Sequence, residues 1–329
     1  MAGHLHMLSQ AGAPPVSEST LRHHLTRLAE ARGSDPWFDD FTPASITGGA
    51  GRLHLDVRAA EGARATVVFV PGTNAYALLY GELLRALSDR RLNVVGLDPR
   101  GHGRSDGLRG SYTLSELIDD LDAAVTYARR RFGGPVFVAG SSQGGITAFY
   151  YAAMHDDVAG ALCHNIADLD DPESVRCMRH PGLGAQLRPF LPRLAELAPE
   201  FPVPMCAYLD LASEPVRGAG SAADILLSDP LTVPFIRLRA LASLARGPIR
   251  DPGRQIRCPV LVLHAGADAI FPADYVARVL DRVGAPTSLR VYPGLAHYMV
   301  VDDVPAFLED VLAWTDSVLS SGEPCPFTA

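Results

Sequence analysis

The chain is short of several features that mark particular classes of protein. Cysteine occurs only five times in 329 residues, and the five are scattered without a C-x-x-C pair. Such cysteines indicate neither a disulfide framework nor a structural zinc site, and a reducing cytoplasm is the expected location. The first ten residues contain two histidines but no lysine or arginine, unlike the basic start of a secretory signal.

Long apolar runs and an excess of positive charge are also missing. No apolar run approaches the roughly 20 residues that a membrane-spanning helix needs, so we expect no membrane span. The formal net charge is −8, and we therefore expect no nucleic-acid partner. The composition, with 47% hydrophobic and 20% charged residues, is that of a globular protein with one large domain or one domain carrying an insertion.

Apolar runs typical of buried strands alternate with helical patterns along two stretches of the chain. The expected strands are 53–57, 65–70, 92–97, 135–139, 158–164, 260–264 and 288–292. The expected helices are 77–90, 113–131, 145–155, 272–283 and 304–319. Continuous apolar strands that alternate with helices predict a mostly parallel central sheet flanked by helices, which is the α/β class.

The stretch between these two regions loses the alternation. It is rich in Pro, Leu, Ala and Arg, and it is too long for a plain loop. We expect a helical cap, or lid, at 166–256, inserted into a core formed by 46–165 and 257–320. Apolar residues of this insertion would either roof a substrate pocket or pack within the cap itself, namely Phe190, Leu191, Leu194, Leu197 and Phe201.

Two terminal segments complete the predicted organisation, an arm at 1–45 and a tail at 321–329. In the arm, Ser17 is expected to cap a helix that carries Leu21, Leu25 and Leu28 on one face. Three roles are open for the arm: it covers the body, it joins a homo-oligomer, or it is partly disordered.

The motif Gly140-Ser141-Ser142-Gln143-Gly144 stands between an expected strand and an expected helix. With 30 glycines in the chain, this G-x-S-x-G pattern also arises by accident as a plain turn. The strand–turn–helix context favours a nucleophile elbow, in which a sharp turn exposes a serine at the strand's carboxyl end. Ser141 is the alternative nucleophile, but only Ser142 has glycine two residues before and two residues after it.

A serine hydroxyl needs a base, and the base needs an acid that orients it. Asp268 follows the expected strand 260–264, and His297 follows the expected strand 288–292. Taken alone, Asp268 is equally a turn or helix-cap residue, and His297 is a surface histidine. Their order after Ser142, and their positions in loops at one edge of the sheet, predict a Ser142, Asp268 and His297 triad.

Rival residues exist for the base and for the acid. His102 is the rival base, but it precedes the serine and is expected to pack its own loop. Asp168, Asp170 and Asp171 are the rival acids, and they lead directly into the insertion.

The oxyanion formed in such a reaction needs preorganised N–H donors. The backbone N–H groups of Gln143 and Thr73 are expected to form this oxyanion hole. For Thr73 the alternative is an ordinary turn at Pro71-Gly72.

Five motifs in order resemble the α/β-hydrolase superfamily: Val70-Pro71-Gly72-Thr73, Asp98-Pro99-Arg100-Gly101-His102-Gly103-Arg104-Ser105, the pentapeptide around Ser142, the Asp268 loop and Gly294-Leu295-Ala296-His297. The resemblance covers roughly 52–319 and is greatest to the lysophospholipase and monoacylglycerol-lipase-like branch. Two departures concern the pocket: Pro71 stands where that family usually has His, and Ser141 and Gln143 stand where it usually has His and Met.

The resemblance implies a serine hydrolase that cleaves a carboxylic ester through an acyl-enzyme, without a metal ion or an organic cofactor. Its partner would be a small-molecule acyl substrate such as a lysophospholipid or a monoacylglycerol. A thioesterase, a lactonase and an acyltransferase would use the same triad. A non-catalytic ligand-binding protein on this fold is the alternative of a different class.

Overall fold

Eight strands form the central sheet in residues 16–321, the part of the chain that a computed structural model describes. Their order across the sheet is β1-β2-β4-β3-β5-β6-β11-β12. Only β2 runs antiparallel to its neighbours. The strands span Thr42–Gly48 (β1), Gly51–Arg58 (β2), Ala65–Val70 (β3), Leu92–Asp98 (β4), Val136–Ser141 (β5), Gly160–His164 (β6), Val260–Ala265 (β11) and Thr287–Tyr292 (β12).

Seven of these strands lie where apolar runs predicted them, and the α/β-hydrolase class is confirmed. The eighth, β1, was not predicted, and it begins before the predicted start of the core at residue 46. Its residues are half-buried or exposed rather than continuously apolar, and Pro43 lacks the N–H that a central strand needs. Because β1 pairs with β2 alone, at the edge of the sheet, the proline is tolerated there.

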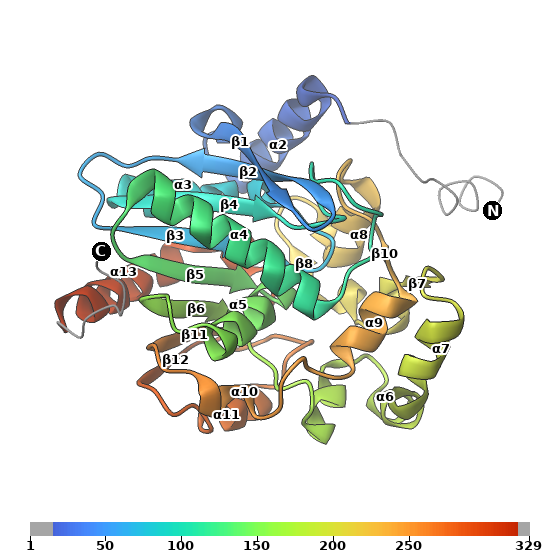
Figure 1. Cartoon of the computed structure of the whole chain (residues 1–329). Helices are drawn as coiled ribbons and strands as arrows, with labels where there is room; N and C mark the ends of the chain where they lie inside the picture. Colours follow the sequence, from blue (N-terminus) through green and yellow to red (C-terminus); the bar gives the residue numbers. More distant parts are fainter. Residues whose placement is uncertain (1–15, 322–329) are drawn as a thin grey trace.

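Helices cover both faces of the sheet (Figure 1). One face carries α4 (Leu114–Phe132), α5 (Gln143–Met154) and α11 (Ala273–Leu280), whose buried side chains form one apolar core. The other carries α3 (Gly81–Asp89), α12 (Met299–Asp302) and α13 (Val304–Ser320), which form a second core. Thr113 caps α4 in a capping box with Glu116. The two cores pack against opposite faces of the sheet, and they therefore hold the carboxyl ends of its strands in place.

The described part of the arm packs on the second of these faces. Helix α2 (Glu18–Arg32) begins at the predicted N-cap, Ser17, and buries its three leucines in the same core as α3 and α13. The indole of Trp37 adds a hydrogen bond of 2.8 Å from Nε1 to the carbonyl of Leu78. Residues 16–45 therefore cover the body. The first part of the arm, 1–15, and the predicted tail after 321 lie outside the described residues.

Residues 166–256, called the insertion below, form short helices and two-residue to three-residue strands. The larger elements are α6 (Pro181–Leu187), α7 (Leu191–Leu197), α8 (Ala222–Ser228) and α9 (Leu238–Leu244), with small pairs β7 (Pro202–Pro204) with β10 (Phe235–Arg237) and β8 (Pro215–Val216) with β9 (Gly220–Ser221). Short α10 (Pro252–Gln255) leads back to β11. Figure 1 shows α6, α7 and α9 beyond the arrowheads of β3, β5 and β6.

The expectation for the apolar side chains of the insertion was wrong in most cases. Leu191 is buried, whereas the other four are exposed to solvent, with Phe190 62% and Leu197 72% accessible. A run of apolar residues at near-helical spacing does not reveal which face of a short helix lies inward.

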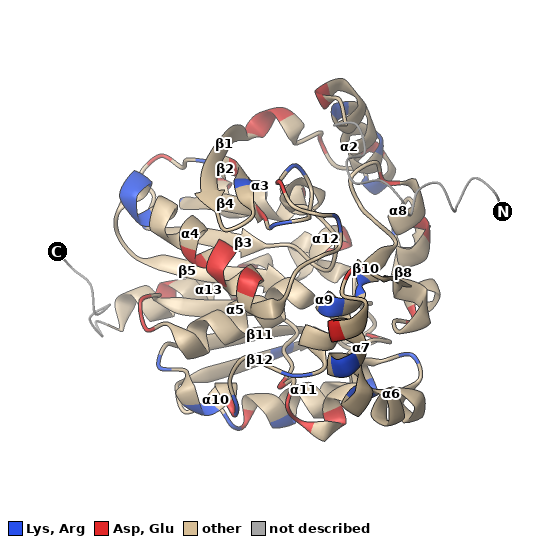
Figure 2. Ribbon diagram, turned by 45° about the vertical axis from the view of Figure 1, so that its right-hand side comes forward, with Lys and Arg blue, Asp and Glu red and all other residues tan. Residues whose placement is uncertain are grey.

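Two further observations concern the charges and the helix lengths of the described residues. Figure 2 shows acidic and basic residues interspersed along the ribbon. Within residues 16–321, none of the helices is long and apolar enough to cross a bilayer.

Candidate active site

Ser142 lies at a strained turn between β5 and α5. Its φ of 55° and ψ of −118° are a conformation that residues other than glycine rarely adopt. A Cβ at Gly140 would collide with Gly144, and one at Gly144 would collide with the carbonyl oxygen of Val70. The backbone N–H of Ser142 donates to the carbonyl of His164 at 2.9 Å. The two glycines of the motif thus allow the close approach that this turn requires.

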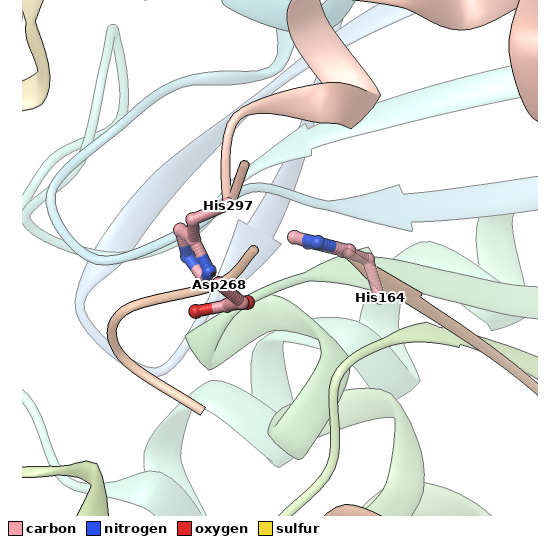
Figure 3. A group of neighbouring side chains, drawn as sticks. All are labelled: His164, Asp268 and His297. Carbon is pink, nitrogen blue, oxygen red and sulfur yellow. Dashed lines mark hydrogen bonds and ion pairs between the residues drawn. The ribbon is translucent and has the colours of Figure 1, made fainter. Parts of the chain in front are cut away.

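Asp268 and His297 lie in the loops after β11 and β12, as their positions in the sequence predicted. Asp268 Oδ2 lies 2.8 Å from His297 Nδ1, and both side chains are largely buried. The other oxygen, Oδ1, accepts the backbone N–H groups of Ile270 at 2.8 Å and Phe271 at 2.9 Å. Figure 3 shows the imidazole directed toward the carboxylate. The carboxylate is therefore held by its own loop while it orients the imidazole.

Ser142 and His297 line the same cavity, together with Gly72, Thr73 and Tyr80. Serine, acid and base therefore meet at the carboxyl ends of β5, β11 and β12, the edge of an open α/β sheet where ligands bind. With Nδ1 bonded to Asp268, the ring nitrogen left for chemistry at His297 is Nε2.

Asn165 is a part of the site that the sequence did not reveal. Directly after β6, it adopts a positive φ of 67°, which asparagine tolerates better than most residues. Its Nδ2 donates to Asp268 Oδ2 at 2.8 Å, and its Oδ1 lies 2.6 Å from His264 Nδ1. The amide therefore joins the acid to the neighbouring strand β11. In the sequence, the only sign of this role is the position of the asparagine at the end of a strand. The three nearby aspartates are more obvious candidates by residue type.

The charges of the site favour an ionised acid beside an imidazole that protonates readily. Burial alone would raise the pKa of Asp268, but His297 and the hydrogen bonds it accepts lower it well below the usual range. Burial alone would lower the pKa of His297, but the carboxylates of Asp268 and Glu214 outweigh this and raise it above its ordinary value of 6.5. Such a base can hold the proton of a serine during attack.

His164 and Ser141 lie behind the acid–base pair. Ser141 Oγ is 3.2 Å from His164 Nδ1, and the rings of His164 and His297 have centroids 5.0 Å apart. Burial, followed by the proximity of His297, lowers the pKa of His164 to about 3, so this ring stays neutral. One ligand atom each from His164, Asp268 and His297 falls within 4.8 Å of the others, but the bond between the last two gives the group the arrangement of an acid–base pair.

Two backbone N–H groups next to Ser142 are available to receive an oxyanion. Within the described residues, neither the N–H of Thr73 nor that of Gln143 donates to another group. The N–H of Gly72, by contrast, donates to Tyr80 Oη at 3.1 Å. Gln143 also lies at the N-terminus of α5, where the helix dipole favours negative charge. The geometry is compatible with the predicted pair of donors.

Three of the rival residues, His102, Asp168 and Asp171, have structural partners elsewhere. His102 Nδ1 lies 2.8 Å from the carbonyl of Arg100, its ring packs against Tyr112, and burial lowers its pKa to about 4. Asp168 and Asp171 form ion pairs with Arg282 at 3.2 and 2.8 Å. The chain also contains no lysine, so a lysine cannot activate the serine.

A larger, mainly apolar cavity of about 110 Å³ opens on the other side of Ser142. Its walls include Ile146 of α5 and Phe271 of the acid loop, and many come from the insertion, among them Val175, Met178, Leu191, Leu209, Leu241 and Leu244. The serine therefore lies between two cavities, and the larger is suited to an aliphatic chain.

Comparison with known proteins gives one family. The pattern of the family described as serine aminopeptidase, S33 (Hydrolase_4) matches residues 61–303. A monoacylglycerol lipase from Mycolicibacterium smegmatis is 30% identical over 260 residues, which cover 78% of this chain and 89% of that protein. A putative monoglyceride lipase from Schizosaccharomyces pombe is 24% identical, covering 76% of this chain and 67% of its own length.

Solved structures share the fold. The monoacylglycerol lipase of Paleococcus ferrophilus superposes with a TM-score of 0.62 at 22% identity, covering 85% of this chain and 98% of that one. A soluble variant of monoglyceride lipase from Saccharomyces cerevisiae, in complex with a substrate analogue, gives 0.68 at 19% identity, covering 84% and 94%. At these identities the likeness concerns the fold alone.

The raised pKa of His297 leads to a pH prediction. Activity toward a neutral ester should fall as the pH is lowered through this pKa, because only the neutral imidazole accepts a proton from serine. The midpoint of the acid limb should lie above 6.5, because the neighbouring carboxylates favour the charged ring. Measuring kcat/KM between about pH 5 and about pH 9 tests this. A midpoint below 6.5, or a flat profile, would contradict the electrostatics described here.

Proposed function

The chain belongs to the serine aminopeptidase, S33 family of α/β-hydrolases, in its monoacylglycerol-lipase-like branch, and from this premise we propose that Ser142, His297 and Asp268 carry out its reaction. Membership in this branch makes the protein a serine hydrolase of carboxylic esters. The proposal concerns the residues, the placement of the substrate and the substrate class.

One observation supports the assignment most directly. The 2.8 Å contact between His297 Nδ1 and Asp268 Oδ2 leaves Nε2 for chemistry, and His297 shares a cavity with the strained Ser142. A strained nucleophile, a base and a buried ionised acid in this order are the arrangement that activates serine. A protein that only bound an ester would have no need of all three.

In the first half of the reaction, Ser142 Oγ attacks the ester carbonyl carbon and His297 Nε2 takes the hydroxyl proton. The carbonyl oxygen becomes an oxyanion and accepts hydrogen bonds from the backbone N–H groups of Thr73 and Gln143. Asp268 stabilises the imidazolium without taking its proton. The carbon–oxygen bond to the alcohol then breaks, and His297 gives its proton to the departing alkoxide, which leaves an acyl group on Ser142.

In the second half, water takes the place of the alcohol. His297 removes a proton from the water as its oxygen attacks the acyl carbon, and the same two N–H groups receive the second oxyanion. Collapse of this intermediate breaks the bond to Ser142 Oγ, and His297 returns the proton to the serine. The products are a carboxylic acid and an alcohol, and the enzyme is regenerated.

The cavities indicate how the substrate lies. His297 must protonate the leaving alcohol, and of the two cavities it lines only the smaller one, of about 30 Å³. The alcohol part is therefore placed in the smaller cavity, and the acyl chain in the larger apolar one beside Gln143. This arrangement fits a single acyl chain esterified to a small alcohol, because only one cavity suits a chain.

A monoacylglycerol or a lysophospholipid is accordingly the substrate class we favour, in keeping with the names of the relatives. An acyltransferase would bind a different acceptor in the smaller cavity, and thioesters or lactones would use the same residues. A cytoplasmic location, a cap role for the insertion and homo-oligomer formation through the arm remain predictions.

A fluorophosphonate probe tests the assignment of the nucleophile. The wild type and Ser141→Ala should be labelled, whereas Ser142→Ala should not, because the phosphorus bonds to the activated serine. Ester turnover by Ser142→Ala should fall by roughly 10⁴-fold or more. Ser141→Ala is the matched control, since it removes the neighbouring hydroxyl. Equal labelling of wild type and Ser142→Ala, with both proteins folded, would overturn the assignment.

A further inference from the structure

We infer that Glu214, a carboxylate of the insertion, is a positioning residue that fixes the acid and base loops relative to each other. It lies between a short 3-10 helix, Leu211–Ser213, and β8, and its side chain is fully buried. Oε1 accepts the backbone N–H of Ala269 at 2.5 Å, and Oε2 accepts that of His297 at 2.8 Å. Ala269 follows Asp268, so one carboxylate spans both loops. The inference rests on the proposed triad.

The bonding pattern favours the ionised form of Glu214, although burial raises its pKa. Both of its oxygens accept a hydrogen bond, which a carboxylate does more fully than a protonated acid. Within residues 16–321, neither arginine nor any other permanently charged cation forms an ion pair with it. A buried carboxylate is unfavourable unless a positive charge lies near it. The imidazolium that forms on His297 during catalysis is such a charge.

The titratable groups around His297 come from every element packed against it. Asp268 lies on the acid loop, His164 at the end of β6, His264 on β11 and Tyr298 on the base loop itself. Of these, only Asp268 adds negative charge next to the ring. Burial raises the pKa of Glu214, and Glu214 in turn raises that of His297. Two carboxylates, Asp268 at the ring and Glu214 at the backbone N–H of the base, therefore stabilise its charged state.

The same part of the insertion is also tied to the end of α12, the short helix that follows the base loop. The backbone N–H of Arg217 donates to Asp302 Oδ2 at 2.7 Å, and its guanidinium pairs with Asp303 at 2.6 Å. The peptide of Glu214 is itself held by the N–H of Ala222, which donates to its carbonyl oxygen at 2.9 Å. Residues 211–222 thus form a fixed edge of the insertion against the catalytic loops.

The variant Glu214→Gln tests this role, because it keeps the size of the side chain but removes its charge. We expect kcat/KM to fall by about 10- to 100-fold, mainly through kcat, because small displacements of the base have effects of this size. We also expect the acid limb of the pH profile to move to lower pH, since one of the groups that raise the pKa of His297 is gone. Glu214→Asp, which keeps the charge but shortens the reach, should lose kcat while its acid limb stays near that of the wild type.

Asp229→Asn is the matched control. Asp229 is another buried carboxylate of the insertion, and it accepts backbone N–H groups of Leu231 and Thr232 and the hydroxyl of Tyr76. This variant should lower thermal stability without moving the acid limb. An unchanged profile and an unchanged kcat in Glu214→Gln, or the same shift in Asp229→Asn, would overturn the inference. Fluorophosphonate labelling of the wild type separates this outcome from failure of the triad itself. If Glu214→Gln does not fold, the pH profile and kcat of Glu214→Asp test the inference in its place.

An independent observation concerns the wall of the larger cavity, where we propose a subsite for an oxygen atom on the acyl chain. Gln143 and Tyr208 line this cavity and are 4% and 8% exposed. Within the described residues, Gln143 Nε2 and Tyr208 Oη have no hydrogen-bond partner. Gln143 Oε1 accepts from Tyr112 Oη at 3.1 Å, so the amide nitrogen is the unpartnered end.

Two unpartnered donors in a mainly apolar cavity select for a chain with an acceptor. A buried polar group without a hydrogen-bond partner is unfavourable. A ligand that accepts its hydrogen bond therefore binds more favourably than one that leaves it unpaired. Burial also raises the pKa of Tyr208, so its hydroxyl stays protonated and can donate. A carbonyl, hydroxyl or ether oxygen on the acyl chain can accept a hydrogen bond from either donor.

A positional series of nitrophenyl esters tests this subsite. In each member one methylene of a hexanoyl chain is replaced by an ether oxygen, and kcat/KM is compared with that of the hydrocarbon parent. The wild type should prefer the oxygenated ester by about 5- to 10-fold at one position. Gln143→Met, which keeps the backbone N–H, and Tyr208→Phe should each reduce that preference toward unity. A wild type that disfavours oxygen at every position, or a preference that survives in both variants, would overturn the proposal.

Discussion

The hydrogen bond between His297 and Asp268 is the contact on which the site depends, because it joins two loops that are separate in the sequence. It leaves Nε2 as the imidazole nitrogen without this bond, and it lets a buried aspartate stay ionised. Its geometry follows from the sheet, since β11 and β12 are parallel neighbours whose carboxyl ends deliver the two loops to one place. Asn165 from β6 and Glu214 from the insertion hold the same pair from two further sides.

The strain at Ser142 has the same origin in the sheet. A turn that forces a serine to positive φ persists only where its surroundings leave no alternative, and here Gly140 and Gly144 press against neighbouring backbone. The two apolar cores hold β5 from both faces of the sheet, and α5 packs in the first of them. The fold therefore places a strained serine beside the bonded pair of Asp268 and His297 at one edge, where the insertion contributes many walls of the larger cavity.

The sequence predicted the parts that follow from chain order and local pattern. The apolar strands, the glycines around Ser142 and the loops of Asp268 and His297 are all local signals, and the fold they indicate is confirmed. Asn165 and Glu214 were not predicted, because each acts through a contact with residues about 50 to 130 positions away, which no local pattern records. Strand β1 was missed because its residues are partly exposed and include Pro43, and the exposed side chains near Phe190 show how little a short apolar pattern says about direction.

The most direct test of the account is to trap the acyl-enzyme. The protein is mixed with a nitrophenyl ester and quenched in acid within the first turnover, and the acyl group is located by mass spectrometry of peptides. The account predicts one acyl group per chain, on Ser142, and none in a Ser142→Ala variant under the same conditions. An acyl group on another residue, or ester turnover by the wild type with no acyl group at any time, would contradict it.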